Sequence, residues 1–413
     1  MVPEPTAVDP APRGEARVPT GCPELDEMLR GGLVPHRPYL LVGPAGTGKT
    51  SLALQFLCEG VRRGERCLIV TLEEPPNEMR ANHRALAVEM PGHVRIGFTS
   101  ARELAAEIPR ATRRVIVVGM GGSAIAADLV RGVTDPELEV ALEVGRGPSL
   151  PRAIDAGTLT IFTSYSGGTW ETLAAFDEAG RRGATRVTVS SGGELARRAE
   201  RQRVPHLQLP PGLPPRAAVG YMLGGLFGLL DPFFPESNEG RLTRAAAHVA
   251  DLQGGFSDPN GLPARLAQRV GKRTPEFYAD VPLASLARRW KTQVEENAKR
   301  LAHFDLFPEL FHNAIVGWDA VRPADARRWA VVFLEASGPN PALTPGVDYL
   351  AALLKRRGVP VLRVPIEGED RFETLLTGVS LGDHFSLALA EAAGVDPLPV
   401  DAIGRLKAAV SRA

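Results

Sequence analysis

Runs of β-branched and aliphatic residues recur along most of this chain, and each is followed by a stretch with helical spacing of apolar positions. Strands of a parallel sheet have such continuous apolar sequences, because helices cover both faces of the sheet. The pattern predicts strands over residues 115–118, 159–162, 186–189, 207–209, 329–334 and 361–364, with helices over 282–300 and 347–357. Right-handed crossovers would fold these elements into two doubly wound αβα sandwiches. Turn-forming residues over 231–260 predict a loop-rich bridge between the sandwiches.

The first hundred residues have a different pattern. Residues 1–17 are rich in proline and are predicted to be disordered. A short helix, a strand over 39–42, a helix over 51–62 and a strand over 67–72 follow, which is the beginning of a separate α/β segment. The predicted organisation is therefore a tail at 1–17, a partial P-loop NTPase-like segment at 18–102, and two sandwich domains at 103–236 and 261–413.

The loop GPAGTGKT lies between a predicted strand and a predicted helix of the N-terminal segment. It matches the Walker A pattern, in which backbone N–H groups cradle phosphates, a lysine supplies charge and a hydroxyl holds Mg²⁺. The candidate nucleotide-binding residues are Gly43, Gly46, Gly48, Lys49 and Thr50. The strand at 114–118 carries no aspartate for the metal. The loop can still bind ATP and Mg²⁺, but we therefore expect weak or no hydrolysis.

Two loops rich in glycine and hydroxyl residues follow the strands at 115–118 and 159–162. In parallel sheets such loops lie at the carboxyl edge, where ligands bind. Glycine lets the backbone approach an anion, and helix N-termini and hydroxyl groups donate hydrogen bonds to it. One such loop could be a simple turn, but a pair predicts a phosphate site. Its candidate residues are Gly121, Gly122, Ser123, Ser164, Ser166 and Thr169.

Composition narrows the choice of partners. The 413 residues include 48 basic and 48 acidic side chains, so the balance of charge does not suggest a nucleic-acid partner. No apolar run is long enough for a membrane span or a signal peptide, which favours a cytoplasmic protein. Neither the three cysteines nor the histidines have the spacing of a metal site, so we expect no metal.

Six motifs occur in the order found in one enzyme family. They are GMGGS at 119–123, SYSGGT at 164–169, PRAA at 215–218, ENAK at 296–299, PEL and HN at 308–313, and LK at 406–407. Over about 310 residues the chain thus resembles the bifunctional phosphoglucose/phosphomannose isomerases, which contain two SIS (sugar isomerase) domains. The segment before them resembles the start of a KaiC/RecA-like ATPase domain.

The resemblance implies interconversion of glucose 6-phosphate, and of mannose 6-phosphate with less support, with fructose 6-phosphate. Moving a proton between carbons 1 and 2 requires a phosphate anchor, a base and a cation near the enediolate. By resemblance, Glu296 is the base, Arg216 stabilises the enediolate, and His312, assisted by Lys407, opens the sugar ring. The resemblance also implies that the reaction needs no cofactor and that His312 is donated by the partner in a homodimer.

Other interpretations remain open at the level of sequence. Glu296 and Lys299 have the spacing of a solvated salt bridge on a helix, and His312 could be an interior histidine. The whole chain could be a regulatory protein that binds sugar phosphates without catalysis, or a KaiC-like ATP-binding protein with an SIS tail. A sensor, however, has no need of Glu296, Arg216 and His312.

Overall fold

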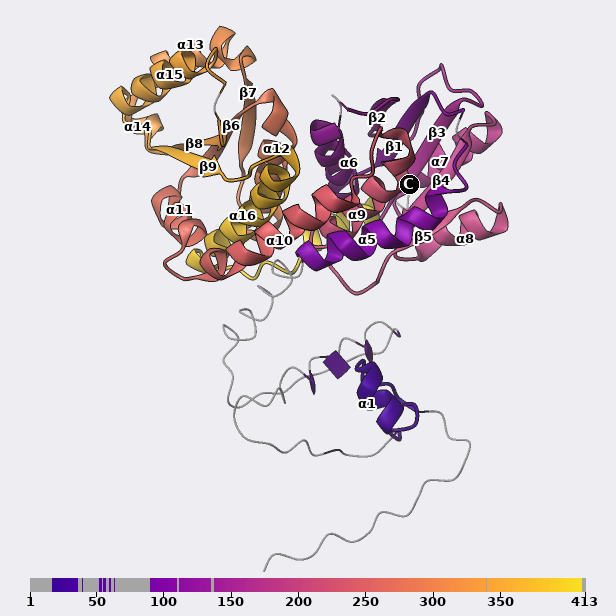
Figure 1. The fold of residues 1–413 in the computed structure, drawn as a ribbon. Helices are drawn as coiled ribbons and strands as arrows, with labels where there is room; N and C mark the ends of the chain where they lie inside the picture. Colours follow the sequence, from indigo (N-terminus) through magenta and orange to yellow (C-terminus); the bar gives the residue numbers. More distant parts are fainter. Residues whose placement is uncertain are drawn as a thin grey trace, which may run out of the picture. The chain divides into compact units, whose positions relative to one another are not determined.

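In a computed structural model the chain divides into two compact units, residues 1–75 and 76–413 (Figure 1). The structure describes residues 17–35, 39, 52–53, 55–56, 59–60, 63, 90–109, 111–134, 137–338 and 340–410. In the first unit, helix α1 (Pro23–Met28) follows a turn in which Thr20 donates two hydrogen bonds to Asp26. The predicted P-loop and the strand over 67–72 lie outside the described residues, as do residues 1–16.

The second unit begins with a five-stranded parallel sheet in the order β2-β1-β3-β4-β5. Side chains of β1 alternate between the faces: Val115 and Val117 join the core under α6, whereas Ile116 and Val118 contact the layer of α7 and α8. The elements are β1 (Arg114–Gly119), α6 (Gly121–Thr134), β2 (Ala141–Gly145), β3 (Thr158–Thr163), α7 (Trp170–Arg181), β4 (Thr185–Ser190), α8 (Gly193–Arg201) and β5 (His206–Gln208).

A four-stranded parallel sheet in the order β7-β6-β8-β9 forms the second sandwich (Figure 1). Helices α11, α12 and α16 cover one face, and α13, α14 and α15 cover the other. The elements are α11 (Leu262–Val270), β6 (Thr274–Asp280), η3 (Val281–Leu283), α12 (Ala284–Asn297), β7 (His303–Phe307), η4 (Glu309–His312), α13 (Ala314–Ala320), α14 (Pro323–Ala326), β8 (Trp329–Ala336), α15 (Thr344–Arg356), β9 (Val361–Ile366) and α16 (Arg371–Ala392). The prediction of two αβα sandwiches is confirmed.

Helix α5 (Met90–Ala105) packs against α9 (Val219–Leu230), every residue of which is buried. Glycines allow the two backbones to touch: a Cβ at Gly224 would lie 2.0 Å from the carbonyl oxygen of Val94, and one at Gly220 would lie 2.7 Å from that of Met90. The sequence had not indicated this helix, and the expected domain boundary between residues 102 and 103 falls inside it.

The loop-rich bridge expected over 231–260 is wrong for most of its length. After the short η2 (Asp231–Phe233), residues 239–257 form helix α10 (Glu239–Ser257). Its buried Leu242, Ala246 and Val249 recur at helical spacing, and one core cluster continues through α10 from the first sheet to the second. The two sandwiches are therefore joined by packed structure.

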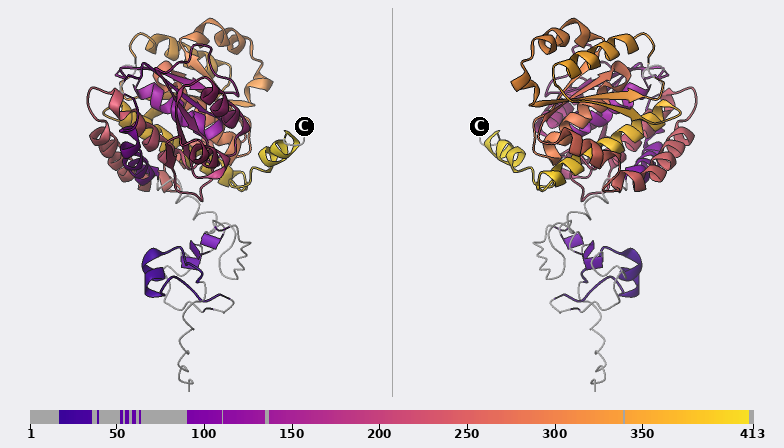
Figure 2. Two further views of the ribbon diagram at one scale, coloured as in Figure 1. Left: turned by 90° about the vertical axis from the view of Figure 1, so that its right-hand side faces the viewer. Right: turned by 90° about the vertical axis from the view of Figure 1, so that its left-hand side faces the viewer.

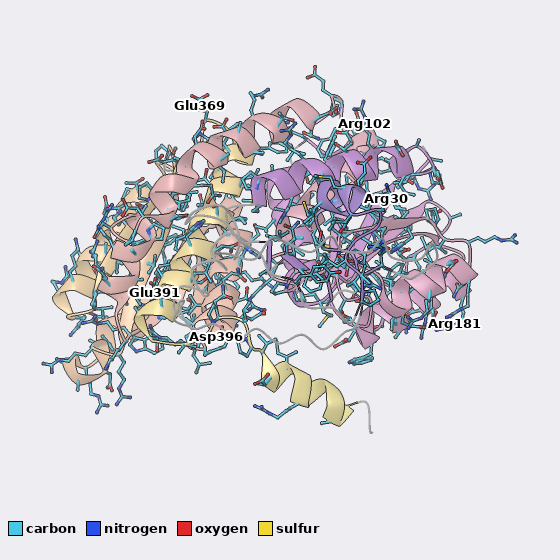
Figure 3. The ribbon with its side chains drawn as sticks, turned by 90° about the horizontal axis from the view of Figure 1, so that it is seen from below. Arg30, Arg102, Arg181, Glu369, Glu391 and Asp396 are labelled. Atoms are coloured by element: carbon cyan, nitrogen blue, oxygen red, sulfur yellow. The ribbon has the colours of Figure 1, made fainter. Side chains whose placement is uncertain are left out.

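The C-terminal helix α17 (Asp401–Val410) extends outward from the rest of the unit (Figure 2). Asp396 marks the segment between α16 and α17 (Figure 3). Within the described ranges, no helix combines the length and the apolar character that crossing a lipid bilayer requires.

Candidate active site

The two predicted phosphate loops lie side by side, because they follow strands that are direct neighbours. Gly119 at the end of β1 is paired in register with Thr163 at the end of β3. The Tyr165 backbone N–H donates to Ser123 Oγ (3.3 Å), which joins one loop to the other. A Cβ at Gly119 would lie 2.4 Å from Thr163 Oγ1, so only glycine permits this approach.

Hydroxyl groups and helix N-termini converge at this carboxyl edge. Ser164 Oγ and Thr169 Oγ1 are 2.9 Å apart, and the Gly168 N–H donates to Ser166 Oγ (3.4 Å). Helix α6 begins at Gly121 with no acidic residue in its first turn, and α7 begins just after Thr169. Backbone N–H groups at these two helix starts favour an anion. The edge therefore has the donors that a phosphate group requires.

Arg216 lies against the first of these loops, since a Cβ at Gly122 would be 3.2 Å from the Pro215 carbonyl oxygen and 3.7 Å from Arg216 Cα. Its side chain is almost fully buried, and burial lowers the pKa of the guanidinium, while the nearby Glu296 carboxylate opposes that shift. Arg216 Nη2 donates to the carbonyl oxygens of Pro397 (2.6 Å) and Leu398 (3.2 Å). A buried cation is thus held mainly by neutral oxygens.

Glu296 is the carboxylate that faces this cation. Its Oε2 lies 3.5 Å from Arg216 Nη1, and its side chain is 29% exposed, so substrate can reach it. The neighbouring Glu295 instead forms an ion pair with Lys291 (2.6 Å) on the same helix. The geometry therefore separates the two glutamates and assigns the candidate base to position 296.

The alternative salt bridge between Glu296 and Lys299 is not among the ion pairs of the described residues. Lys299 Nζ donates to the backbone carbonyls of Glu296 and Pro397, the latter at 2.8 Å. Burial and the nearby Arg216 both lower the pKa of Lys299. A second cation, not assigned from the sequence, therefore lies beside the Arg216 and Glu296 pair.

The structure does not bring His312 to this pair within one chain. Helix α12 returns from the carboxyl edge of the second sheet, so Glu296 lies near the amino edge. Strand β7 then crosses the sheet again before η4, and the exposed His312 lies near the carboxyl edge. Five residues of β7 span roughly 16 Å at about 3.3 Å per residue. Lys407 lies in α17, with its side chain outside the described part.

Four buried polar residues around Arg216 were not recognised from the sequence. Three of them, Arg289, Gln293 and Asn297, recur every four residues on α12, and all three contact the α16 region through hydrogen bonds. The fourth is Asp383 on α16. Polar residues at this spacing, among the apolar Leu286, Trp290 and Val294, were a signal that the sequence did contain.

No group of three or more His, Cys, Asp or Glu side chains among the described residues could hold a metal ion. The convergent groups are instead hydroxyls, helix N-termini, two cations and one accessible carboxylate. Together they can anchor a phosphate, move a proton and stabilise a developing negative charge.

A bifunctional phosphoglucose/phosphomannose isomerase from Caldicellulosiruptor bescii is 31% identical over 305 residues, covering 71% of this chain and 88% of that protein. The chain belongs to this family. Residues 261–410 match the model of the bacterial phosphoglucose isomerase C-terminal SIS domain. The C-terminal domain of glucosamine-fructose-6-phosphate aminotransferase from Francisella tularensis has a similar fold, with a TM-score of 0.61 at 12% identity, covering 75% of this chain and 95% of that one.

The N-terminal segment has separate relatives. Residues 18–108 match the KaiC ATPase family model. The circadian clock protein KaiC3 of Synechocystis is 44% identical over 77 residues, which cover 19% of this chain and 15% of that protein. Both resemblances expected from the sequence are thus confirmed. The KaiC match extends to residue 108 and so overlaps α5, which packs with the first sandwich.

Proposed function

We propose that this member of the family interconverts glucose 6-phosphate and fructose 6-phosphate, with mannose 6-phosphate as a second aldose to be tested. The observation that carries the proposal is the pairing of a buried Arg216 with an accessible Glu296, 3.5 Å apart, beside the phosphate loops. This pair supplies the base and the cation that an enediolate reaction needs.

In the proposed reaction, the loops that contain Ser123, Ser164, Ser166 and Thr169, with Gly121 and Gly122, hold the phosphate. Glu296 accepts the proton from carbon 2 of the open-chain aldose, and the electron pair of the broken C–H bond forms the enediolate. Arg216 stabilises the negative charge on its oxygens. Glu296 then returns the proton to carbon 1, while the hydroxyl proton passes from the oxygen on carbon 2 to the oxygen on carbon 1, which gives the ketose. No metal or cofactor enters this scheme.

We further propose that the active unit is a homodimer in which the second copy donates His312 for ring opening. The support is topological: Glu296 and His312 lie near opposite edges of one sheet, so a second copy offers the simplest source of the histidine. Lys407 on the outward-extending α17 is proposed to assist the opening.

We also propose that the N-terminal segment is a partial P-loop NTPase-like fold, separate from the two SIS domains. The residues Gly43, Gly46, Gly48, Lys49 and Thr50 are proposed to bind ATP and Mg²⁺ weakly and to contribute nothing to isomerisation. With a sugar-phosphate substrate, the cytoplasm is the proposed location.

The first experiment is a coupled assay of fructose 6-phosphate formation from each aldose phosphate, before and after exhaustive chelation of metals. We expect turnover of glucose 6-phosphate that chelation does not reduce. Binding of the sugar phosphates without turnover would instead favour the regulatory function.

A mixing experiment tests the shared site. Glu296→Gln and His312→Ala variants, each inactive alone, should recover about a quarter of wild-type activity when mixed equally, since half the dimers are mixed and each has one complete site. The control is a mixture of Glu296→Gln with Arg216→Ala, two groups of the same chain, which should not complement. Failure of the first mixture despite measured subunit exchange would rule out the shared site.

A further inference from the structure

Arg216 is held at two separate points by residues of α12. Asn297 Oδ1 accepts a hydrogen bond from Arg216 Nε at 2.6 Å. One end of the buried Arg289 side chain, Nη2, donates to the backbone carbonyl of Arg216 at 3.1 Å. One contact fixes the guanidinium and the other fixes the main chain that carries it.

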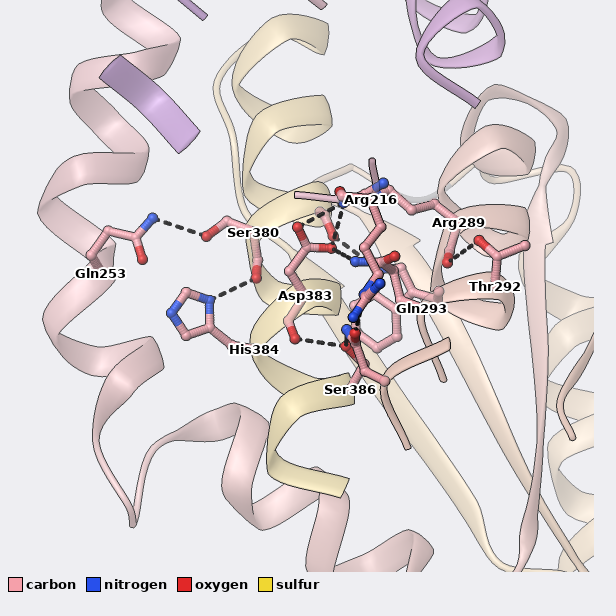
Figure 4. A network of polar contacts seen from close by, with 12 residues as sticks. Arg216, Gln253, Arg289, Thr292, Gln293, Ser380, Asp383, His384 and Ser386 are labelled. Carbon is pink, nitrogen blue, oxygen red and sulfur yellow. Dashed lines mark hydrogen bonds and ion pairs between the residues drawn. The ribbon is translucent and has the colours of Figure 1, made fainter. Parts of the chain in front are cut away.

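Both of these residues are themselves fixed by α16. Asn297 Nδ2 donates to Ser386 Oγ (2.9 Å), which donates in turn to the Asp383 carbonyl (2.8 Å). The Asp383 carboxylate accepts from Arg289 Nη2 and from Gln293 Nε2, each at 2.8 Å (Figure 4). All five side chains are nearly or completely buried. Buried polar groups that hydrogen-bond to one another in this way restrict the motion of a site.

Two of the three guanidinium nitrogens of Arg216 donate hydrogen bonds to neutral oxygens of the protein. Nε is bound by Asn297, and Nη2 is bound by the Pro397 and Leu398 carbonyls. Nη1, which faces Glu296, is the nitrogen that is left for substrate. Rotation of the guanidinium plane would turn Nη1 away from Glu296, and the Asn297 hydrogen bond opposes that rotation.

We propose that Asn297 is a positioning residue, which orients the Arg216 guanidinium so that Nη1 is directed at the enediolate beside Glu296. This inference rests on the proposed function and deepens it. An amide suits the role because its oxygen accepts from Nε while its nitrogen donates to Ser386, which anchors it at both ends.

Gln253 provides a matched control for a purely structural role. Like Asn297, it is a buried amide whose nitrogen donates to a serine hydroxyl of α16, in this case Ser380 Oγ at 3.0 Å. It belongs to α10, and the hydrogen bonds of the Arg216 guanidinium go instead to Asn297 and to the carbonyls that follow α16. Removing either amide leaves a buried hydroxyl without its donor, but only the change at Asn297 removes a hydrogen bond to the guanidinium.

The test compares Asn297→Ala, Asn297→Asp and Gln253→Ala in the full-length enzyme, with kcat, KM and Tm measured for each. Misplacing a catalytic group by a small distance costs up to about a hundredfold in rate. We therefore expect Asn297→Ala to lower kcat roughly ten- to a hundredfold with KM changed less than about threefold. Asn297→Asp, which keeps an acceptor for Nε, should recover most of this loss. Gln253→Ala should lower Tm but keep kcat.

A binding measurement adds a second readout. An aldonate phosphate, whose carboxylate imitates the enediolate oxygens, should bind Asn297→Ala more weakly by a factor similar to the loss in kcat, whereas affinity for fructose 6-phosphate should change little. Equal losses for both ligands would overturn the positioning role.

The isomerase function and the positioning role of Asn297 can be disproved separately. An active wild-type enzyme whose Asn297→Ala and Gln253→Ala variants lose the same kcat would overturn the positioning role and leave the isomerase function in place. A wild-type protein that turns over no sugar phosphate would overturn the proposed function, and the role of Asn297 would fall with it.

Discussion

The two sandwiches have the same parallel design, but their carboxyl edges are chemically different. The first sheet ends in glycines, hydroxyl groups and the N-termini of two helices. At the corresponding edge of the second sheet lie two carboxylates, Asp280 and Glu335, which line a cavity of about 300 Å³. Glu335 forms an ion pair with Arg363 (2.5 Å). Carboxylates repel a phosphate, whereas N–H and hydroxyl donors attract it. Both domains have a carboxyl edge at which a ligand could bind. The residues that follow the strands determine whether that ligand can be an anion.

The second sheet contributes to the site from its opposite edge, through the end of α12. That end provides Glu296 and Asn297, and Lys299 lies just beyond it. In the proposed reaction, one domain thus binds the phosphate and the other provides the base. The separate roles of the two domains can be tested by substitutions that change only one of them.

The largest effect is expected at the base. Glu296→Gln should lower kcat by roughly 10²-fold or more, with KM for the sugar phosphate within a few-fold, because the change removes a proton acceptor and little ground-state binding. Steady-state kinetics in both directions measure this. The matched control is Glu295→Gln, whose carboxylate pairs with Lys291 and should be dispensable. Loss at 295 with retention at 296 would reverse the assignment.

A smaller effect is expected at the phosphate edge. Ser164→Ala should raise KM roughly tenfold, because a hydrogen bond to a charged group contributes about 1.5–3 kcal/mol. Ser337→Ala provides the comparison, since Ser337 follows β8 as Ser164 follows β3 but donates to the Ile366 carbonyl. Its KM should stay at the wild-type value. Equal increases in KM for both variants would contradict the distinction between the two edges.

A substitution at Glu276, on one face of the second sheet, should change the stability of the protein but not its activity. Burial, together with the nearby Asp305, raises the pKa of Glu276 to about 7. The folded state therefore holds this proton more tightly than the unfolded state, and the free energy of unfolding should fall as pH rises from about 4.5 to about 7. Glu276→Gln should remove that loss, a gain of roughly 1–3 kcal/mol at pH 8 and little at pH 4.

Thermal melts of both proteins across this pH range measure the effect. The kcat of Glu276→Gln at pH 8 should equal that of the wild type, since Glu276 shares the β6 face of Tyr278, under α13 to α15, whereas α12 with Glu296 covers the opposite face. A change in kcat without a change in Tm would indicate a catalytic carboxylate on this face.

The smallest effect is expected from the N-terminal segment. Lys49→Ala should leave kcat and KM of isomerisation unchanged, because the strand at 114–118 carries no aspartate for the metal that ATP hydrolysis requires. Isomerase assays with and without ATP, together with phosphate release, measure this. Hydrolysis that depends on Lys49, or an isomerase rate that responds to ATP, would show that the two parts of the chain act together.

Several of the strands that the sequence revealed have long apolar or buried runs, although β4 and the short β5 contain mostly polar residues. β1, β3 and β8 have long buried runs, whereas β2 and β7 are half-exposed edge strands and β6 contains Pro275 and Glu276. Helix α5 escaped notice because Pro91, Gly92 and Gly97 are poor helix formers. Its packing on α9 stabilises it instead, and tertiary packing is not visible in local propensity.

The residues of the candidate site also differ in how far the sequence could predict them. The phosphate loops follow β1 and β3, which are neighbours in the sheet, and the sequence pattern predicted that the two loops lie together. The convergence of Arg216 with Glu296, first suggested by family resemblance, depends on contacts between segments eighty residues apart. The polar spacing on α12 could have indicated that Asn297 is a buried polar residue, but not that its partners are Ser386 and Asp383 of α16.

The close packing of α5 on α9 has a practical consequence for anyone who divides this protein. Helix α9 is almost wholly apolar and entirely buried, and α5 covers it along glycines that leave no room for a substitute. A fragment that begins at residue 103 would keep every proposed catalytic group and yet present a bare hydrophobic helix to water. Such a fragment should aggregate on expression, whereas one that begins before Met90 should remain dispersed. A fragment that contains the two SIS domains should therefore begin before Met90, although the match to the KaiC family extends to residue 108.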